Sequence, residues 1–575
     1  MADPVATETK PKVSAPDPYE AMPWLALFDP DHPPSIMPQF HDVLAMFRAA
    51  VARAPERDAI RYFDGRISWR ELDTLTDALA VDLIERGFQS GDRLGLYLQN
   101  VPQFVIGAVA AWKAGGIAVA INPMNRAREI TQLFNDCTPK AVICHGSAYE
   151  RVLAPLREAA GVHMPPLVYT TTAADFQTRN VPALFNGVHA RRFPETIDLK
   201  EALQGSRGCK PAATPHYRAS DIAFLVYTSG TTGEPKGAMC THGNMAFNGE
   251  ALRRWIKLED GMSILGIAPL FHITGLICHV VASFSNASPL ILAYRFEPGV
   301  MLDIIEEHKP DFAIGAITAY IAMMNHPAAT PAKFASLTRV YSGGAPIPPT
   351  VVEEFHRRFG HWILPGYGMT ETNAPTHIAP LGCRPPVDPN TGALSVGIPF
   401  FNTRAWICDD EGNSLPVGEI GEIVVEGPMI VSGYWQKPEE TAQTIRQGRL
   451  FTGDIGFMDK DGWFYVVDRK KDMIIASGYK VWPRDVEDVL YTHPAVREAA
   501  VVPALDPYRG ETVKAVISLK PGQSATPEEI IEFCKSRMAA YKYPRIVEII
   551  DDLPKTVTGK ILRRELRAKA ASASH

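Results

Sequence analysis

The sequence predicts an α/β protein in which helices cross over between buried parallel strands. Helical and strand signals alternate through the first half of the chain, and short apolar runs between helical stretches are typical of strands buried on both faces. These runs cover residues 94–98, 141–144, 222–226, 264–268 and 312–314. The 43 glycines and 48 prolines among 575 residues indicate many turns between short elements.

The first strong helix signal begins at Ser68. Ser68 and Glu71 have the spacing of a capping box, in which the serine accepts from the first turn and the glutamate reaches back. Four leucines then fall on one helical face, and Gly87 provides a stop. The leucines are Leu72, Leu75, Leu79 and Leu83.

Residues 104–121 are the best candidate for a membrane span. Lys113 and the pair Gly115-Gly116 interrupt this stretch, and neither half is long enough to cross a bilayer. The interpretation is a buried helix, a glycine stop and a buried strand, without integral membrane association.

Composition excludes several classes of protein. Hydrophobic residues make up 46% and charged residues 21%, as in globular proteins, and the net charge of −6 gives no basic field for nucleic acid. The eight cysteines form no CxxC pair, which argues against a zinc site or a disulfide framework and favours a reducing, cytoplasmic location. Residues 1–39 lack a secretory signal, and their repeated prolines predict an extended, mobile arm.

The pattern changes after about residue 402. Short strands bounded by glycines are expected at 421–426, 463–467, 499–503 and 513–519, and residues 527–541 have the pattern of an amphipathic helix. The charged run 468–472 is interpreted as a solvated linker to a smaller mixed region, or equally as a surface turn.

Residues 227–237, YTSGTTGEPKG, are the most informative segment. Four Ser/Thr hydroxyls alternate with glycines directly after a strand, and Lys236 follows. Glycines let backbone N–H groups approach anionic oxygens, hydroxyls add donors, and a lysine supplies a charge, so the segment suits a polyphosphate. Its spacing departs from the common P-loop, and a flexible surface loop is the alternative.

Three further stretches could contact a nucleotide, but each is a weaker signal when taken alone. Residues 366–372, GYGMTET, offer an aromatic ring to stack on a base, a threonine for a phosphate and Glu371 for Mg²⁺, although a capped turn explains them too. Residues 452–454, TGD, predict a turn whose aspartate could accept from ribose or form an Asx-turn. Residues 555–564, KTVTGKILRR, place Lys560 directly after a glycine, which suits a cation that contacts a ligand. The alternative is a solvated basic tail.

These stretches occur in order with DRKKDMIIASGYKVWP, residues 468–483, and together they resemble the adenylate-forming superfamily of acyl-CoA synthetases, luciferases and peptide-synthetase adenylation domains. The resemblance spans about residues 40–566. It implies a large N-terminal region of two α/β subdomains plus a small β-rich subdomain, followed by a small mobile α+β domain. The expected boundaries are an arm at 1–39, an adenylation domain at 40–470, a mobile domain at 471–567 and a tail at 568–575.

The resemblance implies a reaction in which a carboxylic acid and ATP form an acyl-adenylate with release of pyrophosphate, and coenzyme A then displaces AMP. Thr370 is expected at the α-phosphate, Glu371 and Thr228 at Mg²⁺, and Lys560 at the α-phosphate and carboxylate. Asp454 and Arg469 are expected at the ribose. The implied phosphate-binding residues are Thr228, Ser229, Gly230, Thr231, Thr232, Gly233 and Lys236, and those at the adenine are Gly344, Ala345, Pro346, Tyr367 and Gly368.

Lys471 matches the family hinge about which the C-terminal domain rotates, withdrawing Lys560 and bringing Gly478 and Tyr479 to coenzyme A. It would otherwise be a surface charge.

The motif position of His272 implies a role at the entrance of the acid pocket, whereas a lone histidine in apolar surroundings is otherwise a core residue. Gly315, Ala316 and the segment up to residue 327 resemble the fatty-acyl branch, as does Ser477 before Gly478. A medium- or long-chain fatty acid is therefore favoured, with an aromatic or alicyclic acid left open.

The sequence leaves two other functions as alternatives. An enzyme that loads a carrier protein would need a carrier acting in trans, and a non-catalytic relative would be expected to lose Glu371, Asp454 or Lys560, which are all present. The sequence does not fix the oligomeric state, with a homodimer left open, and peripheral membrane contact is also left open.

Overall fold

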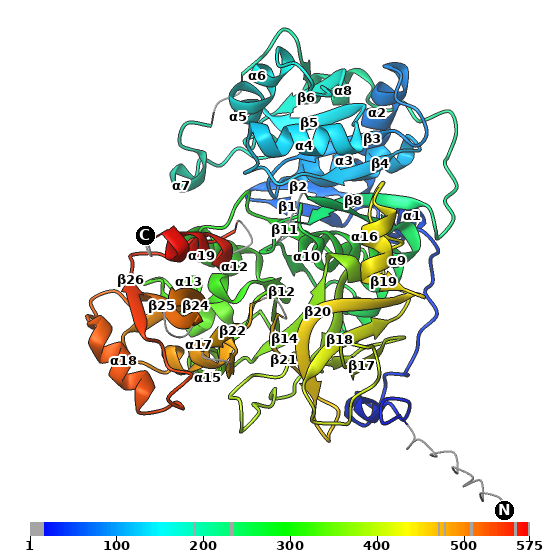
Figure 1. Cartoon of the computed structure of the whole chain (residues 1–575). Helices are drawn as coiled ribbons and strands as arrows, with labels where there is room; N and C mark the ends of the chain where they lie inside the picture. The colour runs from blue at the N-terminus through cyan, green and yellow to red at the C-terminus, as the bar shows by residue number, and fades with distance from the viewer. Residues whose placement is uncertain are drawn as a thin grey trace, which may run out of the picture.

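The computed structural model describes residues 17–188, 191–228, 235–469, 472–476, 479–506, 510–556 and 560–572. It confirms the predicted fold class. Two α/β sheets and a smaller β-sheet form the large N-terminal region, and a fourth sheet with helices forms the small C-terminal domain. In Figure 1 the C-terminal domain, orange to red, lies at the lower left beside the nine-stranded sheet, and the seven-stranded sheet lies at the top.

The seven-stranded sheet has the order β7-β6-β5-β3-β4-β8-β9 and is parallel except for β9. Its strands are β3 (Arg93–Tyr97), β4 (Ile117–Ala120), β5 (Ala141–His145), β6 (Leu167–Thr171), β7 (Ile197–Asp198), β8 (Ile222–Thr228) and β9 (Lys236–Thr241). The helical elements between Ser68 and β8 are α2 (Trp69–Glu85), α3 (Pro102–Lys113), α4 (Ala127–Cys137), α5 (Gly146–Ala148), η2 (Tyr149–Leu153), α6 (Ala154–Arg157), α7 (Pro182–Phe185) and α8 (Leu199–Gly205).

The nine-stranded sheet has the order β16-β15-β14-β13-β12-β10-β11-β1-β2, and its central strands are parallel. Its strands are β1 (Asp58–Tyr62), β2 (Gly65–Ser68), β10 (Ile264–Leu265), β11 (Leu290–Leu292), β12 (Phe312–Gly315), β13 (Arg339–Gly343), β14 (Ile363–Met369), β15 (Ala374–Ile378) and β16 (Ile398–Pro399). Its helical elements are α1 (Val43–Arg53), α9 (His242–Trp255), α10 (Ile273–Gly275), η3 (Leu276–Val281), α11 (Ala282–Asn286), α12 (Pro298–His308), α13 (Ile317–Asn325), α14 (Pro331–Phe334), α15 (Pro349–Phe359) and η4 (Thr370–Thr372).

The two smaller sheets follow in sequence. The third sheet and its helix comprise β17 (Arg404–Cys408), β18 (Gly421–Glu426), α16 (Pro438–Thr444), β19 (Ile445–Arg446), β20 (Arg449–Met458) and β21 (Phe464–Arg469). The C-terminal domain comprises β22 (Ile474–Ala476), β23 (Tyr479–Val481), α17 (Pro483–Tyr491), β24 (Val496–Asp506), β25 (Gly510–Leu519), α18 (Pro527–Lys535), β26 (Ile546–Ile549) and α19 (Arg563–Ser572).

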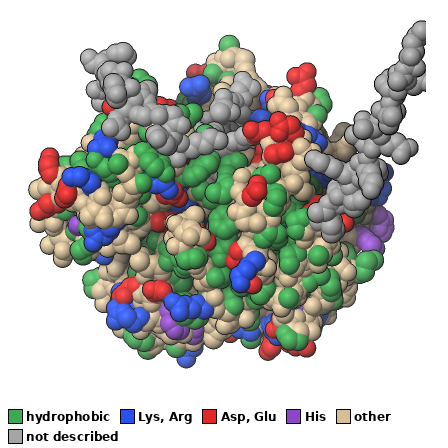
Figure 2. Space-filling model, turned by 60° about the horizontal axis from the view of Figure 1, so that its bottom comes forward, with side chains coloured by type: hydrophobic (Ala, Val, Ile, Leu, Met, Phe, Trp, Pro, Cys, Tyr) green, Lys and Arg blue, Asp and Glu red, His purple; other side chains and the backbone are tan. Residues whose placement is uncertain are grey.

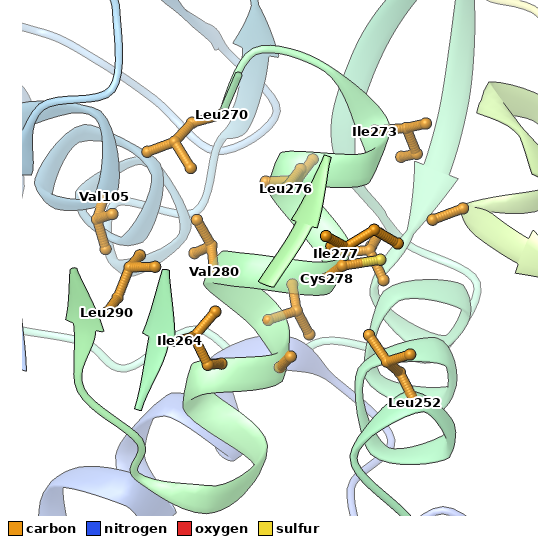
Figure 3. Close-up of a cluster of buried hydrophobic side chains, with 14 of the residues drawn as sticks. Val105, Leu252, Ile264, Leu270, Ile273, Leu276, Ile277, Cys278, Val280 and Leu290 are labelled. Carbon is orange, nitrogen blue, oxygen red and sulfur yellow. The ribbon is translucent and has the colours of Figure 1, made fainter. Parts of the chain in front are cut away.

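A buried apolar cluster joins the two α/β sheets (Figure 3). Leu290 lies beside Val105 of α3, Ile264 of the neighbouring strand lies on the side of Val280 in η3, and Leu252 of α9 contributes from the other side. The whole of η3 is buried between them. Burying each such side chain stabilises the fold by roughly 1.5–3 kcal/mol, so this layer fixes the sheets relative to each other.

The predicted helix and strand at residues 104–121 are confirmed as α3 and β4, both buried. Within the part of the chain that the structure describes, no helix has both the length and the apolar content needed to cross a membrane.

The capping box at Ser68 is only half formed. Ser68 Oγ accepts from the backbone N–H of Glu71 at 3.1 Å, and α2 carries the predicted leucine face. The Glu71 carboxylate instead lies 4.0 Å from the guanidinium of Arg207. The expectation that it reaches back to the serine is therefore wrong, because a distant cation competes for it.

Residues 17–39, the described part of the expected arm, pack against the large region. Trp24 in η1 (Pro23–Leu27) is buried and meets Phe464 edge-on, with 5.9 Å between ring centroids. Phe28 meets Trp255 edge-on at 4.9 Å. These contacts differ from the expectation of a mobile arm for this stretch, because its aromatic side chains are fixed between two subdomains. The domain boundaries themselves remain predictions.

Two other expectations are corrected in the C-terminal domain. The helix predicted for 527–541 ends at Lys535, because the Ser536 hydroxyl and the Arg537 guanidinium both donate to the carbonyl of Phe533. Asp472, expected in a solvated charged run, is buried and pairs with Arg563 at 3.5 Å and Arg567 at 3.0 Å.

On the face shown in Figure 2, basic side chains lie among acidic, apolar and neutral ones rather than in one basic field.

Buried histidines should make stability depend on pH. Burial lowers the pKa of His242 and His377 to about 3 and that of His145 and His279 to about 4, against 6.5 in an unfolded chain. Between about pH 6.5 and 4 the unfolded chain binds protons that the folded protein does not. Stability is therefore fully present above pH 6.5 and falls as the pH decreases.

We expect each of these histidines to contribute up to about 1.4 kcal/mol per pH unit in that window. Thermal unfolding midpoints measured from pH 8 to pH 4.5 test this. They should be level above pH 7 and fall below pH 6, with a shallower fall in His242→Gln. A midpoint that is constant down to pH 4.5 would contradict the expectation.

Candidate active site

The predicted phosphate-binding segment connects two antiparallel strands of the seven-stranded sheet. Thr228 at the end of β8 lies opposite Lys236 at the start of β9, and its hydroxyl donates to the Lys236 carbonyl at 3.4 Å. The pairing holds the two ends of the segment together. Its predicted residues Ser229, Gly230, Thr231, Thr232 and Gly233 lie outside the described residues.

Lys236 and Glu371 are linked by a tyrosine that the sequence analysis did not identify. The Nζ of Lys236 lies 5.1 Å from the centre of the Tyr434 ring, and the Tyr434 hydroxyl donates to Glu371 Oε1 at 2.7 Å. The available signal was weak: an aromatic pair after Gly433, at a distance from the recognised motifs.

The adenine-site residues lie at the carboxyl ends of adjacent parallel strands, where open α/β sheets bind ligands. Gly344, Ala345 and Pro346 follow β13, and Tyr367 lies near the end of β14, with Gly343 and Gly366 paired between the two strands. The fold thus brings together segments that are about twenty residues apart in sequence.

A hydrogen bond joins a residue predicted at the ribose to one predicted at the adenine. The Tyr367 hydroxyl donates to Asp454 Oδ2 at 2.8 Å, and Asp454 is 6% exposed. The segment TGD was predicted as a turn, but it lies within β20 as a bulge, because Phe451 and Ile455 face Val424 and Glu422 of β18. Gly453 supplies the positive φ of 71° that the bulge needs.

Arg469 lies directly opposite Asp454 across the β20–β21 pair. This places its backbone at the predicted ribose site, while its side chain is outside the described part of the structure.

Gly368 permits the close approach of β14 and the turn after it. A Cβ at this position would lie 1.9 Å from the Ala374 carbonyl oxygen, whereas a Cβ at Gly366, two residues earlier, would have its nearest neighbour at 3.9 Å. We therefore expect Gly368→Ala to displace the backbone beside Tyr367, at a cost of about 1–3 kcal/mol, and to weaken AMP binding.

Gly366→Ala in the same strand is the matched control, and its stability and AMP affinity should be close to those of the wild type. Thermal unfolding and AMP titration of both variants provide the measurement. Equal behaviour of the two alanines would contradict the steric argument.

Thr370 and Glu371 lie in η4, directly after β14. The turn that follows is unusual, because Asn373 and Ala374 have φ values of 49° and 80°. The buried side chain of Asn248 donates to the Thr372 and Asn373 carbonyls, which holds this backbone in place. The Glu371 backbone carbonyl also accepts from Val431 N–H at 2.9 Å.

The donor set fits Mg²⁺. Glu371 supplies a carboxylate and Thr228 a hydroxyl, and Mg²⁺ is typically held by one or two carboxylates together with substrate phosphates. The described residues contain no group of three or more His, Cys, Asp or Glu side chains that could hold a metal without those phosphates. Since Oε1 of Glu371 accepts from Tyr434, the other carboxylate oxygen can face the ion.

The charge of Lys560, in the C-terminal domain, acts on His272 in the large N-terminal region. His272 Nδ1 accepts from Thr274 N–H at 3.3 Å, so the neutral ring carries its proton on Nε2. Burial, followed by the charge of Lys560, lowers the pKa of His272 to about 4. The backbone of Lys560 is bonded to Thr556: its N–H donates to Thr556 Oγ1 at 3.1 Å and its carbonyl accepts from Thr556 N–H at 2.7 Å.

The predicted acid-pocket residues Gly315 and Ala316 lie where β12 ends and α13 begins. Gly315 is paired with Ser342 of β13, next to the adenine segment. A Cβ on Gly315 would lie 2.7 Å from Ile267 Cγ2, so glycine allows this strand end to approach the segment that leads to His272. The first turns of α13 bury apolar side chains there, including Ile317 and Ile321.

The predicted hinge residue Lys471 and the predicted coenzyme A residue Gly478 lie outside the described residues. Tyr479 begins β23, and only its backbone position is described.

Comparisons with known proteins agree with this geometry. Residues 47–435 match the AMP-binding enzyme family, and residues 485–560 match the AMP-binding enzyme C-terminal domain. A long-chain-fatty-acid–CoA ligase of Bacillus subtilis (strain 168) is 36% identical over 96% of this chain and 99% of its own. A feruloyl-CoA synthase of Amycolatopsis sp is 33% identical over 90% and 96%.

Two solved structures are also similar. The anthranilate CoA ligase AuaEII in complex with anthranoyl-AMP has a TM-score of 0.83 at 26% identity, over 94% of this chain and 99% of its own. ATP-bound MatB from Rhodopseudomonas palustris has a TM-score of 0.81 at 27% identity, over 94% and 100%. The fold and the site therefore define an adenylate-forming enzyme. The chain belongs to the AMP-binding enzyme family and is an AMP-forming acid–CoA ligase.

Proposed function

We propose that this acid–CoA ligase activates a medium- or long-chain fatty acid through an acyl-adenylate and transfers the acyl group to coenzyme A. The observation that carries the proposal is that the fold brings Lys236 and Glu371 to one side chain, Tyr434, and joins Tyr367 to Asp454, as expected of residues that hold ATP. The charge of Lys560, from the C-terminal domain, also contributes to the low pKa of His272, which is expected at the entrance for the acid.

The proposed site residues would reduce the charge repulsion of the first step. A carboxylate oxygen attacks the α-phosphorus and pyrophosphate leaves, so two anions must approach each other. Lys560 would offset this repulsion at the carboxylate and α-phosphate, and Lys236 would hold the departing phosphates. Mg²⁺ bound by Glu371 and Thr228 would neutralise charge on the phosphate oxygens. Tyr367 and Asp454 would hold the nucleoside, and Arg469, which lies opposite Asp454, would also contact the ribose.

The acid side of the site favours an apolar substrate. After Gly315, α13 buries Ile317, Tyr320, Ile321, Met323 and Met324, and the Tyr320 hydroxyl donates to the backbone carbonyl of Tyr341. Apolar walls with flexible methionines suit an alkyl chain. The relationship to long-chain-fatty-acid–CoA ligases supports this assignment.

An aromatic acid is the second candidate, and one observation favours it. The feruloyl-CoA synthase relative covers 90% of the chain at 33% identity, close to the identity of the fatty-acid enzymes. A short planar pocket would be built from the same strand ends.

The second step requires the C-terminal domain to change its orientation. We propose Lys471 as the hinge and Gly478 and Tyr479 as contacts of coenzyme A, since a rotation about residue 471 would remove Lys560 and present β22 and β23 instead. One site need not then hold pyrophosphate and coenzyme A together. We also propose a cytoplasmic location, because all eight cysteines are unpaired.

The test is release of AMP and pyrophosphate with and without coenzyme A across acetate, hexanoate, decanoate, palmitate, benzoate and 4-coumarate. Coenzyme A-dependent turnover that peaks at decanoate or palmitate is expected. A peak at benzoate or 4-coumarate would assign the aromatic alternative. Pyrophosphate exchange without an acyl-CoA product would point to a carrier-protein acceptor and overturn the second step.

A further inference from the structure

Tyr434 lies between two parts of the site that come from different regions of the chain. Its hydroxyl donates to Glu371 Oε1 at 2.7 Å, while the face of its ring lies 5.1 Å from Lys236 Nζ. Lys236 begins the strand after the phosphate-binding segment, and Glu371 follows β14 in the other α/β sheet. One side chain thus contacts the cation and the carboxylate expected to act on the same phosphates.

The backbone around Tyr434 is fixed to the phosphate-binding strand. Tyr434 forms an antiparallel bridge with Ala238, Met239 N–H donates to the Gly433 carbonyl at 2.9 Å, and Trp435 N–H donates to the Gly237 carbonyl at 2.7 Å. Its own N–H donates to Thr441 Oγ1 at 2.9 Å. Tyr434 is 6% exposed, so both its ring and its hydroxyl are held in place.

The two contacts have different consequences. A hydroxyl bond to one carboxylate oxygen fixes the rotation of Glu371 and thereby the direction of the other oxygen. The ring attracts the Lys236 ammonium through a cation–π contact without neutralising its charge. A tyrosine hydroxyl is protonated at neutral pH and therefore donates this bond to the carboxylate.

We infer that Tyr434 is a positioning residue: it holds the side chains of Lys236 and Glu371 at the relative positions in which they bind the β- and γ-phosphates of ATP and its Mg²⁺. The inference rests on the proposed function, since it assumes the phosphate and metal roles of these two residues. It gives a specific expectation: Tyr434 should matter for ATP with Mg²⁺ and not for AMP, which carries neither the outer phosphates nor the ion.

The experiment is calorimetric titration of ATP with Mg²⁺, and separately of AMP, in the absence of any acid. Tyr434→Phe keeps the ring below Lys236 and removes the bond to Glu371, and Tyr434→Leu removes both. We expect Tyr434→Phe to weaken Mg²⁺-ATP binding about tenfold, with AMP binding unchanged. Tyr434→Leu should weaken Mg²⁺-ATP binding further, by about threefold.

Tyr169→Phe is the matched control, because the Tyr169 hydroxyl also donates to a carboxylate, Asp82 Oδ2, at 2.7 Å in the seven-stranded sheet. It should leave both affinities unchanged. Combining Tyr434→Phe with Glu371→Gln should be no worse than Glu371→Gln alone.

Unchanged Mg²⁺-ATP binding in Tyr434→Phe would overturn the inference, as would equal weakening of AMP and Mg²⁺-ATP together with a lower unfolding temperature. These readouts need no acid. A wild-type protein that binds both nucleotides yet activates no acid would therefore count against the proposed function and leave the test of Tyr434 intact.

Discussion

Lys560→Ala is expected to lower the rate of acyl-adenylate formation by about 10²–10³-fold, because it removes the charge that we propose to act where the carboxylate meets the α-phosphate. The Lys560 side chain takes no part in the two bonds that join the Lys560 backbone to Thr556, so the alanine should leave both bonds intact. Acid-dependent exchange of pyrophosphate into ATP measures this half-reaction. Transfer from supplied acyl-adenylate to coenzyme A should be spared.

Lys542→Ala is the matched control, since Lys542 belongs to the same domain and pairs with Asp485 at 2.7 Å. It should leave both half-reactions near the wild-type rate. An equal loss of both half-reactions in Lys560→Ala would contradict the separation of the two steps between domain orientations.

The pKa of His272 offers a second measurement on the same variant. Lys560 contributes to the lowering of this pKa after burial. Removing the charge should therefore raise the pKa of His272 above about 4, in the direction of its ordinary value. Nuclear magnetic resonance of the histidine ring would follow this change without any substrate.

The strands of the fold were predictable because parallel strands covered on both faces need continuous apolar runs. All five runs predicted as strands fall on strands β3, β5, β8, β10 and β12. The helix predicted from 527 was too long by several residues, because side-chain bonds from Ser536 and Arg537 to one carbonyl ended it. The spacing of hydrophobic residues does not reveal side-chain hydrogen bonds of this kind.

The residues of the candidate site also fall into those that the sequence predicts and those that only the fold reveals. Residues in dense motifs, such as Lys236 and Glu371, could be proposed from the chemistry of glycine, hydroxyl and charged side chains. Tyr434 could not, because its role arises only when residues 433–435 pair with β9, almost two hundred residues earlier. Asp454 was placed in a turn, since the bulge in β20 depends on its register with β18.

Glu371→Gln should lower Mg²⁺-dependent adenylate formation by about 10²-fold whichever acid is supplied. The amide is nearly isosteric with the carboxylate and can still accept from the Tyr434 hydroxyl, so the change is in charge rather than in shape. Loss of the negative charge removes the anionic ligand that we propose for Mg²⁺. Half-saturation by Mg²⁺ should therefore shift to higher concentration.

Glu195→Gln is the matched control, because Glu195 Oε1 also accepts from a tyrosine hydroxyl, that of Tyr149, at 2.7 Å, and lies in the seven-stranded subdomain outside the site. Rates with decanoate, palmitate and benzoate at several Mg²⁺ concentrations give the comparison. AMP binding should remain at the wild-type value in both variants. If Glu371→Gln changed the apparent affinity for one acid and left the Mg²⁺ dependence unaltered, Glu371 would belong to the acid pocket and the metal assignment would be wrong.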